Sequence, residues 1–161
     1  MTRNRLILIA AAGSVAVLLG AFVFQYVFGY APCALCLWQR WPHALAPLIA
    51  VLAFLLGGRL MPMAGAGTMT VSTGLGVYHT GVERAWWPGP ASCTSSGGGL
   101  GGLSGDELLN LDAASAVVLC DEVAWSLFGL SMASYNALGS AVLAALWVLA
   151  AVKSRQGFSA A

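Results

Sequence analysis

The chain opens with an apolar stretch that a water-soluble fold could not bury. Leu6 to Phe28 contains no charged residue, and Gln25 is its only strongly polar member. At about 1.5 Å of rise per residue, a helix of this length crosses the roughly 30 Å hydrocarbon core of a bilayer. Arg3 and Arg5 precede it, as in a secretory signal, but the run is too long for one and no Ala-x-Ala cleavage site follows. We therefore expect an uncleaved transmembrane helix over about 6–28.

Three further stretches are expected to span the membrane, over about 43–56, 63–79 and 132–152. Pro47 lies inside the first of these, where it predicts a kink. Glycines dilute the middle stretch, and small residues of this kind let membrane helices approach closely. The composition agrees, with 59% hydrophobic and 8% charged residues. The predicted fold class is an all-α membrane protein, a four-transmembrane-helix bundle forming a single domain over 1–161.

The basic residues predict how this bundle is oriented. Arg40 and Arg84 fall on one side of the predicted spans, and the other five Lys and Arg fall on the opposite side. Those five are Arg3, Arg5, Arg59, Lys153 and Arg155. Because the side richer in Lys and Arg faces the cytoplasm, both termini are expected inside, with outer loops over about 29–41 and 80–131. A formal net charge of +1 leaves no basic surface for nucleic acid, so lipid is the expected surrounding partner.

The long outer loop is expected to be mostly irregular. Its glycine-rich stretch over 94–102 has the composition of a flexible linker. Ser104 and Glu107 have the spacing of a capping box, which predicts a short helix through Leu111 whose apolar face rests on the membrane surface. A segment with this much glycine cannot bury a core of its own, so no second domain is expected.

All four cysteines fall in the two outer loops. Cys33 and Cys36 form a Cys-x-x-Cys pair in the first loop, and Cys93 and Cys120 lie in the second. Disulfides persist outside the cytoplasm, so two structural crosslinks are one interpretation. However, the small ring that a Cys-x-x-Cys pair closes braces a fold poorly, and such pairs are typical of thiol–disulfide exchange. The sequence therefore favours a membrane thiol oxidoreductase, while the pairing of the four cysteines stays open.

The surroundings of Cys36 suggest where the electrons go. Cys36 is expected near the N-terminal end of the second helix, where the helix dipole favours a thiolate, and Arg40 lies one turn later on the same face. The chain has no flavin or haem motif, so a quinone dissolved in the bilayer is the obvious acceptor, with the guanidinium steadying the developing oxyanion. His79, at the outer end of the third span, is either a packed interfacial residue or a donor to a quinone oxygen.

Other classes of function have less support. A Cys₄ metal site is disfavoured because Cys93 and Cys120 lack a close ligand spacing, so no metal is expected. Leu37 stands where a c-type haem motif needs histidine. A small scaffold or transporter with purely structural disulfides is the main alternative, but no span is expected to carry a buried acid or base of the kind that transport needs. A reductase working outward would need a cysteine on the cytoplasmic side, and the sequence offers none.

Several segments together resemble the disulfide bond formation protein B (DsbB) family of bacterial inner-membrane thiol oxidoreductases. They are Cys33-Ala34-Leu35-Cys36-Leu37-Trp38-Gln39-Arg40, His79 ahead of Gly81-Val82-Glu83, Trp86-Trp87-Pro88-Gly89-Pro90-Ala91-Ser92-Cys93, and Cys120-Asp121 leading into Trp125, Phe128-Gly129-Leu130-Ser131-Met132 and Asn136. Four cysteines in this order on a four-helix topology favour the bacterial oxidase over a vitamin-K-epoxide-reductase-like enzyme. The glycine-rich linker looks unlike the family.

The resemblance implies roles for the cysteines. Cys93 would be attacked by a reduced, periplasmic DsbA-like partner, and Cys120 would be the other half of the loop disulfide. After release, Cys120 would exchange with Cys33. The active cysteines would face the periplasm from a bacterial inner membrane.

The resemblance also implies how the quinone is met. Cys36 would be the thiolate adjacent to ubiquinone or menaquinone, with Arg40 beside it. His79 matches a histidine near the quinone. The expected reaction is therefore transfer of electrons from a dithiol protein to a membrane quinone.

Overall fold

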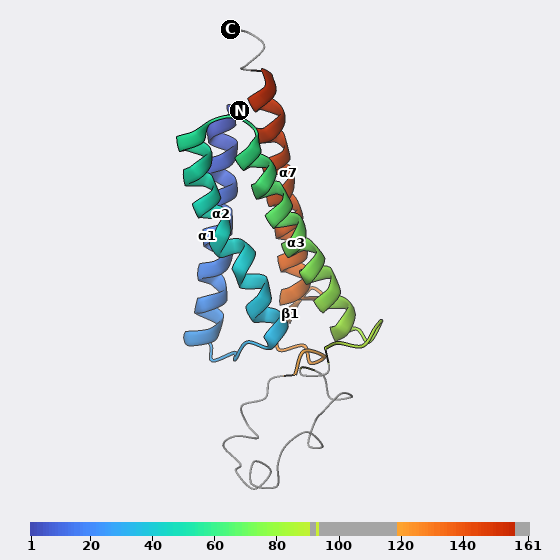
Figure 1. The fold of residues 1–161 in the computed structure, drawn as a ribbon. Helices are drawn as coiled ribbons and strands as arrows, with labels where there is room; N and C mark the ends of the chain where they lie inside the picture. Colours follow the sequence, from blue (N-terminus) through green and yellow to red (C-terminus); the bar gives the residue numbers. More distant parts are fainter. Residues whose placement is uncertain (91–92, 94–118, 157–161) are drawn as a thin grey trace, which may run out of the picture.

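Four long helices lie side by side in the computed structural model, which describes residues 1–90, 93 and 119–156 (Figure 1). In chain order they are α1 (Arg3–Tyr26), α2 (Ala34–Leu56), α3 (Leu60–Glu83) and α7 (Met132–Gln156). Three of them, α1, α2 and α7, are long and apolar enough to cross a membrane. The predicted all-α membrane bundle is confirmed. The start of α1 and the end of α7 lie at one end of the bundle, and the segment joining α1 to α2 lies at the other (Figure 1).

The outward faces of the helices are strongly apolar. Leu8 and Leu19 of α1, Leu55 of α2 and Val142 of α7 are more than half exposed. A water-soluble domain rarely exposes so much contiguous apolar surface, whereas lipid tails solvate it without cost. The helices therefore present to the bilayer the side chains that a soluble bundle would bury.

Small residues let α3 pack closely on α7. A Cβ atom built on Gly76 would lie 2.9 Å from the Cα atom of Ala137, so the two backbones touch at this point. Close packing of the kind that the sequence predicted therefore explains Gly65 and Gly76, but not Gly67 or Gly74, where nothing lies within 4 Å of a Cβ atom.

The helix α2 begins at Ala34, whereas the sequence placed the start of this span near His43. The side chain of Cys33 accepts a hydrogen bond from the backbone N–H of Cys36 and caps the helix at this earlier point. Both Pro42 and Pro47 therefore lie inside a helix that continues past them. The connection from α1 shortens to the residues between Tyr26 and Ala34.

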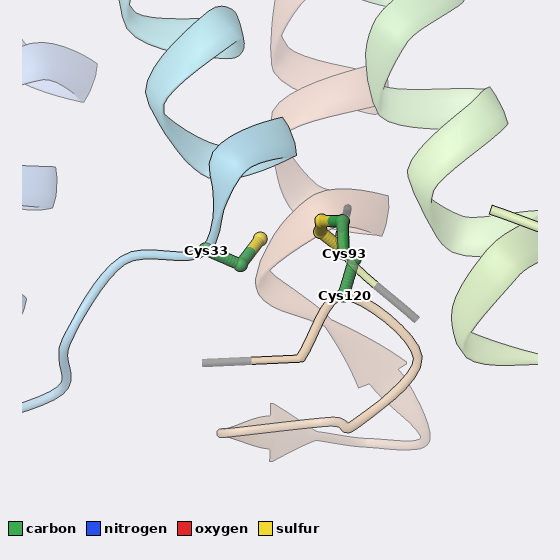
Figure 2. A group of neighbouring side chains, drawn as sticks. All are labelled: Cys33, Cys93 and Cys120. Carbon is green, nitrogen blue, oxygen red and sulfur yellow. A yellow bond between two sulfur atoms is a disulfide. The ribbon is translucent and has the colours of Figure 1, made fainter. Parts of the chain in front are cut away.

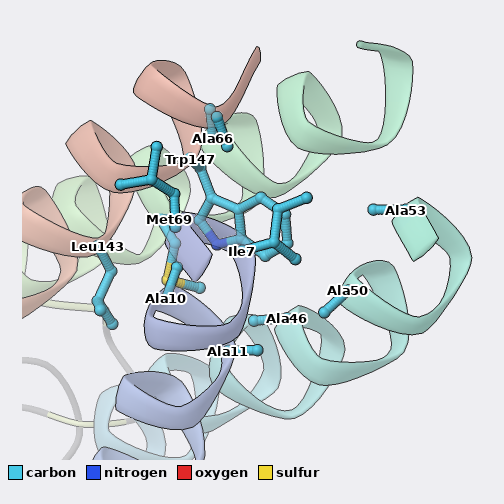
Figure 3. Close-up of a cluster of buried hydrophobic side chains, with 12 residues drawn as sticks. Ile7, Ala10, Ala11, Ala46, Ala50, Ala53, Ala66, Met69, Leu143 and Trp147 are labelled. Atoms are coloured by element: carbon cyan, nitrogen blue, oxygen red, sulfur yellow. The ribbon is translucent and has the colours of Figure 1, made fainter. Parts of the chain in front are cut away.

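The hydrophobic core lies at the start of α1 and α3 and toward the ends of α2 and α7. It is built mostly from alanine (Figure 3). Trp147 of α7 is fully buried in it, and its indole ring occupies the space that a side chain at Gly65 would need. Because alanine and glycine leave room, one large aromatic ring fills the gap between four helices.

Arg3 ties the helices together at this end. Its guanidinium donates to the carbonyl oxygens of Ala53 at 2.7 Å and Gly58 at 3.1 Å, and to Ser154 Oγ at 2.9 Å. These acceptors come from the end of α2, the turn after it and the last turns of α7. A single side chain thus satisfies carbonyl groups that a helix end leaves without partners.

A small hairpin precedes α7, in a region that the sequence predicted as loop. Strands β1 (Ser126–Leu127) and β2 (Leu130–Ser131) pair antiparallel, with Ser126 opposite Ser131. The two turn residues, Phe128 and Gly129, both have positive φ, at 51° and 76°. This is the backbone of a two-residue hairpin turn, but phenylalanine in its first position hides it from sequence inspection. The linker predicted over 94–102 and the helix predicted from Ser104 to Leu111 lie outside the described residues.

Candidate functional site

The first cysteine pair lies where α2 begins. Cys33 and Cys36 are both free, and Cys33 is buried while Cys36 is partly exposed. The Cys33 thiol donates a hydrogen bond to Cys36 Sγ at 2.9 Å, and this bond, together with burial, raises the pKa of the Cys33 thiol. The geometry thus keeps the proton on Cys33 and places the accepting sulfur of Cys36 at the helix N-terminus, where negative charge is favoured.

The second pair is joined. Cys93 and Cys120 form a disulfide with their Cα atoms 5.2 Å apart, and both are buried. The backbone N–H of Cys120 also donates to the carbonyl oxygen of Cys93. The sequence left the pairing open, and the structure joins the two loop cysteines with each other.

The two pairs meet at Cys33. The sulfur atoms of Cys33, Cys93 and Cys120 all lie within 4.8 Å of one another. Figure 2 shows the Cys33 side chain extending from the start of α2 toward the disulfide. Leu35 and Val82 are buried in the same cluster, so the three sulfurs lie among apolar side chains. Thiol–disulfide exchange needs a sulfur nucleophile beside a disulfide, and this arrangement provides one.

His79 projects from α3 against the same sulfur. Its ring is buried, and its Nε2 atom lies 3.6 Å from Cys33 Sγ and 4.0 Å from a carboxylate oxygen of Glu83. Its Nδ1 atom accepts from Gln39 Nε2 at 2.8 Å. The resemblance implied that His79 lies near a quinone, and in the structure its polar neighbours are Cys33, Gln39, Glu83 and the backbone of Cys120.

Arg40 lies one helical turn after Cys36, and its side chain faces α1. The guanidinium donates to Gln25 Oε1 at 2.6 Å and lies over the Phe22 ring, 5.2 Å from its centroid. Gln25, the only strongly polar residue of the first apolar run, is therefore the partner of Arg40. Together they hold a positive charge between α1 and α2, on the face of α2 that also carries Cys36.

Three side chains of the site have the geometry of a possible metal site. The ligand atoms of Cys33, Cys36 and His79 lie within 4.8 Å of one another, a set that could hold a soft metal ion if both thiols were ionised. The absence of a metal stays a prediction.

A cavity of about 440 Å³ opens between α2 and α3. It is lined mainly by Trp38, Trp41, Leu45, Thr68, Val71 and Leu75, and no cysteine lines it.

The bundle also contains a set of buried polar residues that the sequence did not predict. His43 of α2 is 1% exposed and bonds to Asn136 of α7, which in turn bonds to Gln39. The expectation that no span carries a buried acid or base is therefore wrong. His43 stood at the predicted edge of its span, and the earlier start of α2 moves it into the bundle. Polar residues inside apolar spans, such as Ser72 and Ser140 beside His43, were the available signal.

Comparison with known proteins shows the family of the chain. The profile of the family described as Disulfide bond formation protein DsbB matches residues 3–150. A protein of Azoarcus sp. (strain BH72) named Disulfide bond formation protein B is 30% identical over 159 residues, covering 92% of this chain and 95% of that protein. A protein of the same name from Chromohalobacter salexigens is 35% identical over 136 residues, covering 76% of this chain and 75% of that protein.

An uncharacterized protein of Rickettsia prowazekii, RP370, is also similar, being 28% identical over 127 residues, with 78% of this chain and 74% of that protein covered. No solved structure matches the chain. The family profile covers nearly all of the helical bundle and both cysteine pairs. The chain therefore belongs to the DsbB family of disulfide bond formation proteins, and it is a membrane protein that generates disulfides.

Proposed function

We propose that this chain oxidises a periplasmic DsbA-like dithiol protein and passes the two electrons to ubiquinone or menaquinone in the membrane. The observation that carries the proposal is the position of Cys33 Sγ within 4.8 Å of both sulfurs of the Cys93–Cys120 disulfide. A purely structural loop disulfide has no need of a third sulfur beside it. The arrangement instead suits passage of electrons from the loop to the Cys33–Cys36 pair.

The proposed exchange balances at each step. A thiolate of the partner attacks Cys93 Sγ, the Cys93–Cys120 bond breaks, and the electron pair leaves on Cys120. The partner's second thiolate then displaces Cys93, which releases the oxidised partner. Next, Cys120 attacks Cys33 of an oxidised Cys33–Cys36 pair and Cys36 leaves as the thiolate. Finally, Cys93 attacks Cys120 and frees Cys33. In the structure the loop disulfide is closed and Cys33 and Cys36 are free, which fits the state after these exchange steps and before oxidation of that pair.

The residues around Cys36 fit a quinone. Cys36 is the partly exposed member of its pair, and Arg40 one turn later supplies a fixed positive charge. A bound quinone supplies a two-electron acceptor that is soluble in the bilayer. Cys36 would hold the negative charge facing it, and Arg40, held by Gln25 and Phe22 of α1, would stabilise the charge that develops on a quinone oxygen.

The proposal includes the sidedness of the protein. The cysteines gather at the start of α2, and this end of the bundle lies opposite the start of α1 (Figure 1). Arg3 and Arg59 lie at the start of α1 and just before α3, and Lys153 lies near the end of α7. This basic end would face the cytoplasm, and the cysteine end would face the periplasm of a bacterial inner membrane.

The test is quinone reduction by the purified full chain in detergent, driven by a reduced DsbA-type protein. The wild type should turn over. Cys36→Ser should reduce no quinone but still form a mixed disulfide with the partner through Cys93. Cys93→Ser, the complementary variant, should form no mixed disulfide, yet a small dithiol such as dithiothreitol should still drive quinone reduction through Cys33 and Cys36. Undiminished turnover in Cys36→Ser would contradict the mechanism. No turnover of the wild type with several quinones and partners, while the disulfides stay intact, would leave the scaffold with structural disulfides as the better account.

A further inference from the structure

A chain of buried hydrogen bonds runs from the middle of the bundle to Cys33. His43 Nε2 lies 2.8 Å from Asn136 Oδ1, and Asn136 Nδ2 donates to Gln39 Oε1 at 2.7 Å. Gln39 Nε2 lies 2.8 Å from His79 Nδ1, and His79 Nε2 lies 3.6 Å from Cys33 Sγ. These links join α2, α3 and α7. An unpaired polar group costs on the order of several kcal/mol in an apolar medium. Each of these side chains is therefore strongly favoured to keep its hydrogen-bond partner.

One backbone carbonyl determines the direction of every bond in this chain. The Leu35 carbonyl oxygen, which can only accept, lies 3.2 Å from the Gln39 side chain. The Gln39 atom at that position must therefore be the amide nitrogen. The same NH₂ group faces His79 Nδ1, so Nδ1 accepts and the proton of a neutral His79 ring is on Nε2.

The oxygen of the Gln39 amide determines the donors and acceptors on the side of His43. Gln39 Oε1 can only accept, so the Asn136 NH₂ group faces it and Asn136 Oδ1 faces His43. His43 then donates from Nε2. Reversing Gln39 alone would place two oxygens in contact at Leu35 and two NH₂ groups in contact at Asn136, so a flip of Gln39 would require Asn136 to reverse as well.

We infer that Gln39, oriented by the Leu35 carbonyl and by Asn136, is a positioning residue that keeps the proton of His79 on Nε2, where it faces Cys33 Sγ. The inference rests on the proposed function only for its effect on rate. The tautomer itself is a property of the resting protein and is measured without partner or quinone.

The proton on Nε2 matters when Cys33 leaves. As Cys93 attacks Cys120, the Cys93–Cys120 bond forms, the Cys120–Cys33 bond breaks, and the electron pair leaves on Cys33. A hydrogen bond from His79 Nε2–H stabilises that thiolate. The other tautomer would present a lone pair to the same sulfur and repel the charge. Gln39 and Asn136 therefore act on the exchange through His79, without touching the sulfurs.

The chain contains two histidines, His43 and His79, so nitrogen-15 NMR of the histidine-labelled full chain in detergent gives two ring systems to assign. At alkaline pH, where both rings are neutral, each should show a protonated Nε2 and an unprotonated Nδ1. In Gln39→Glu, a carboxylate facing His79 accepts instead of donating, so His79 Nδ1 should become protonated. In Gln39→Met, which keeps the volume but removes the donor, His79 should populate both tautomers.

The matched control is Ser140→Ala, which removes a hydroxyl 3.3 Å from His43 Nε2 and leaves the Gln39 links in place. It should leave the His79 signals where they are. Gln39→Met should also slow transfer of the disulfide from Cys33–Cys36 to the reduced loop, about tenfold, as expected for one hydrogen bond to a charged group. Wild-type His79 carrying its proton on Nδ1, or His79 signals unmoved by both Gln39 substitutions, overturns the inference even if quinone reduction is observed.

Discussion

At the scale of single residues, the account depends on which sulfur atoms can reach one another. Cys33 lies within 4.8 Å of both loop sulfurs, whereas Cys36 does not belong to that group of atoms. In the double variant Cys36→Ser, Cys93→Ser, we expect mild oxidation to join Cys33 to Cys120 rapidly and almost completely. Peptide mapping by mass spectrometry measures the yield. The matched variant Cys33→Ser, Cys93→Ser, which leaves Cys36 and Cys120, should react more slowly, and equal rates would contradict the arrangement.

Arg40 gives a second prediction at this scale. Its guanidinium is fixed by Gln25 and Phe22 on the face of α2 that carries Cys36. Arg40→Ala should therefore raise the KM for quinone about tenfold, the effect of losing one charge-assisted hydrogen bond, and change the KM for the dithiol partner little. Arg84→Ala is the control, because Arg84 instead donates to the Gly129 carbonyl oxygen. An unaltered quinone KM in Arg40→Ala would remove Arg40 from the quinone site.

At the scale of the elements, close packing of α3 on α7 gives the clearest prediction. Gly76→Ala would press a methyl group against the backbone of Ala137, which lies 2.9 Å away, so the helices must separate. We expect a loss of about 1–3 kcal/mol of stability, the usual cost of overpacking. Gly67→Ala is the matched control, because nothing lies within 4 Å of a Cβ there. Thermal unfolding in detergent compares the two; equal transitions would contradict the contact.

The elements also show what the sequence could and could not predict. The apolar run in α1 is continuous, and α7 carries no charged residue before Lys153, so their positions followed from hydrophobicity and length. The start of α2 did not, because Gln39, Arg40 and His43 interrupt its hydrophobic pattern although the helix continues through them. The β1–β2 hairpin was missed because each strand has two residues.

Only part of the site could be predicted from the sequence. The Cys-x-x-Cys spacing is typical of thiol–disulfide exchange, so Cys33 and Cys36 could be recognised from the sequence. Contacts between distant helices leave no such pattern, and the bond between Asn136 of α7 and Gln39 of α2 is of this kind. Its donors and acceptors become meaningful only once the helices are placed together.

At the scale of the whole molecule, the proposed orientation can be tested in cells. In a variant without native cysteines, Trp86→Cys would place a thiol at an exposed position near the cysteine end, and Arg59→Cys would place one at the opposite end. A membrane-impermeant maleimide should label Trp86→Cys in intact spheroplasts and Arg59→Cys only after lysis, because the basic end faces the cytoplasm. The reverse pattern of labelling would invert the proposed topology.

The central claim is that one bundle connects a dithiol protein to a membrane quinone through two cysteine pairs that meet at Cys33. The most direct measurement is the stoichiometry of the purified chain without oxygen, with reduced DsbA-type protein and ubiquinone or menaquinone supplied together. The account predicts one partner disulfide formed for each quinone reduced, with no reaction when Cys33 is replaced by serine. A Cys93–Cys120 disulfide that persists while partner and quinone both remain unchanged would contradict it.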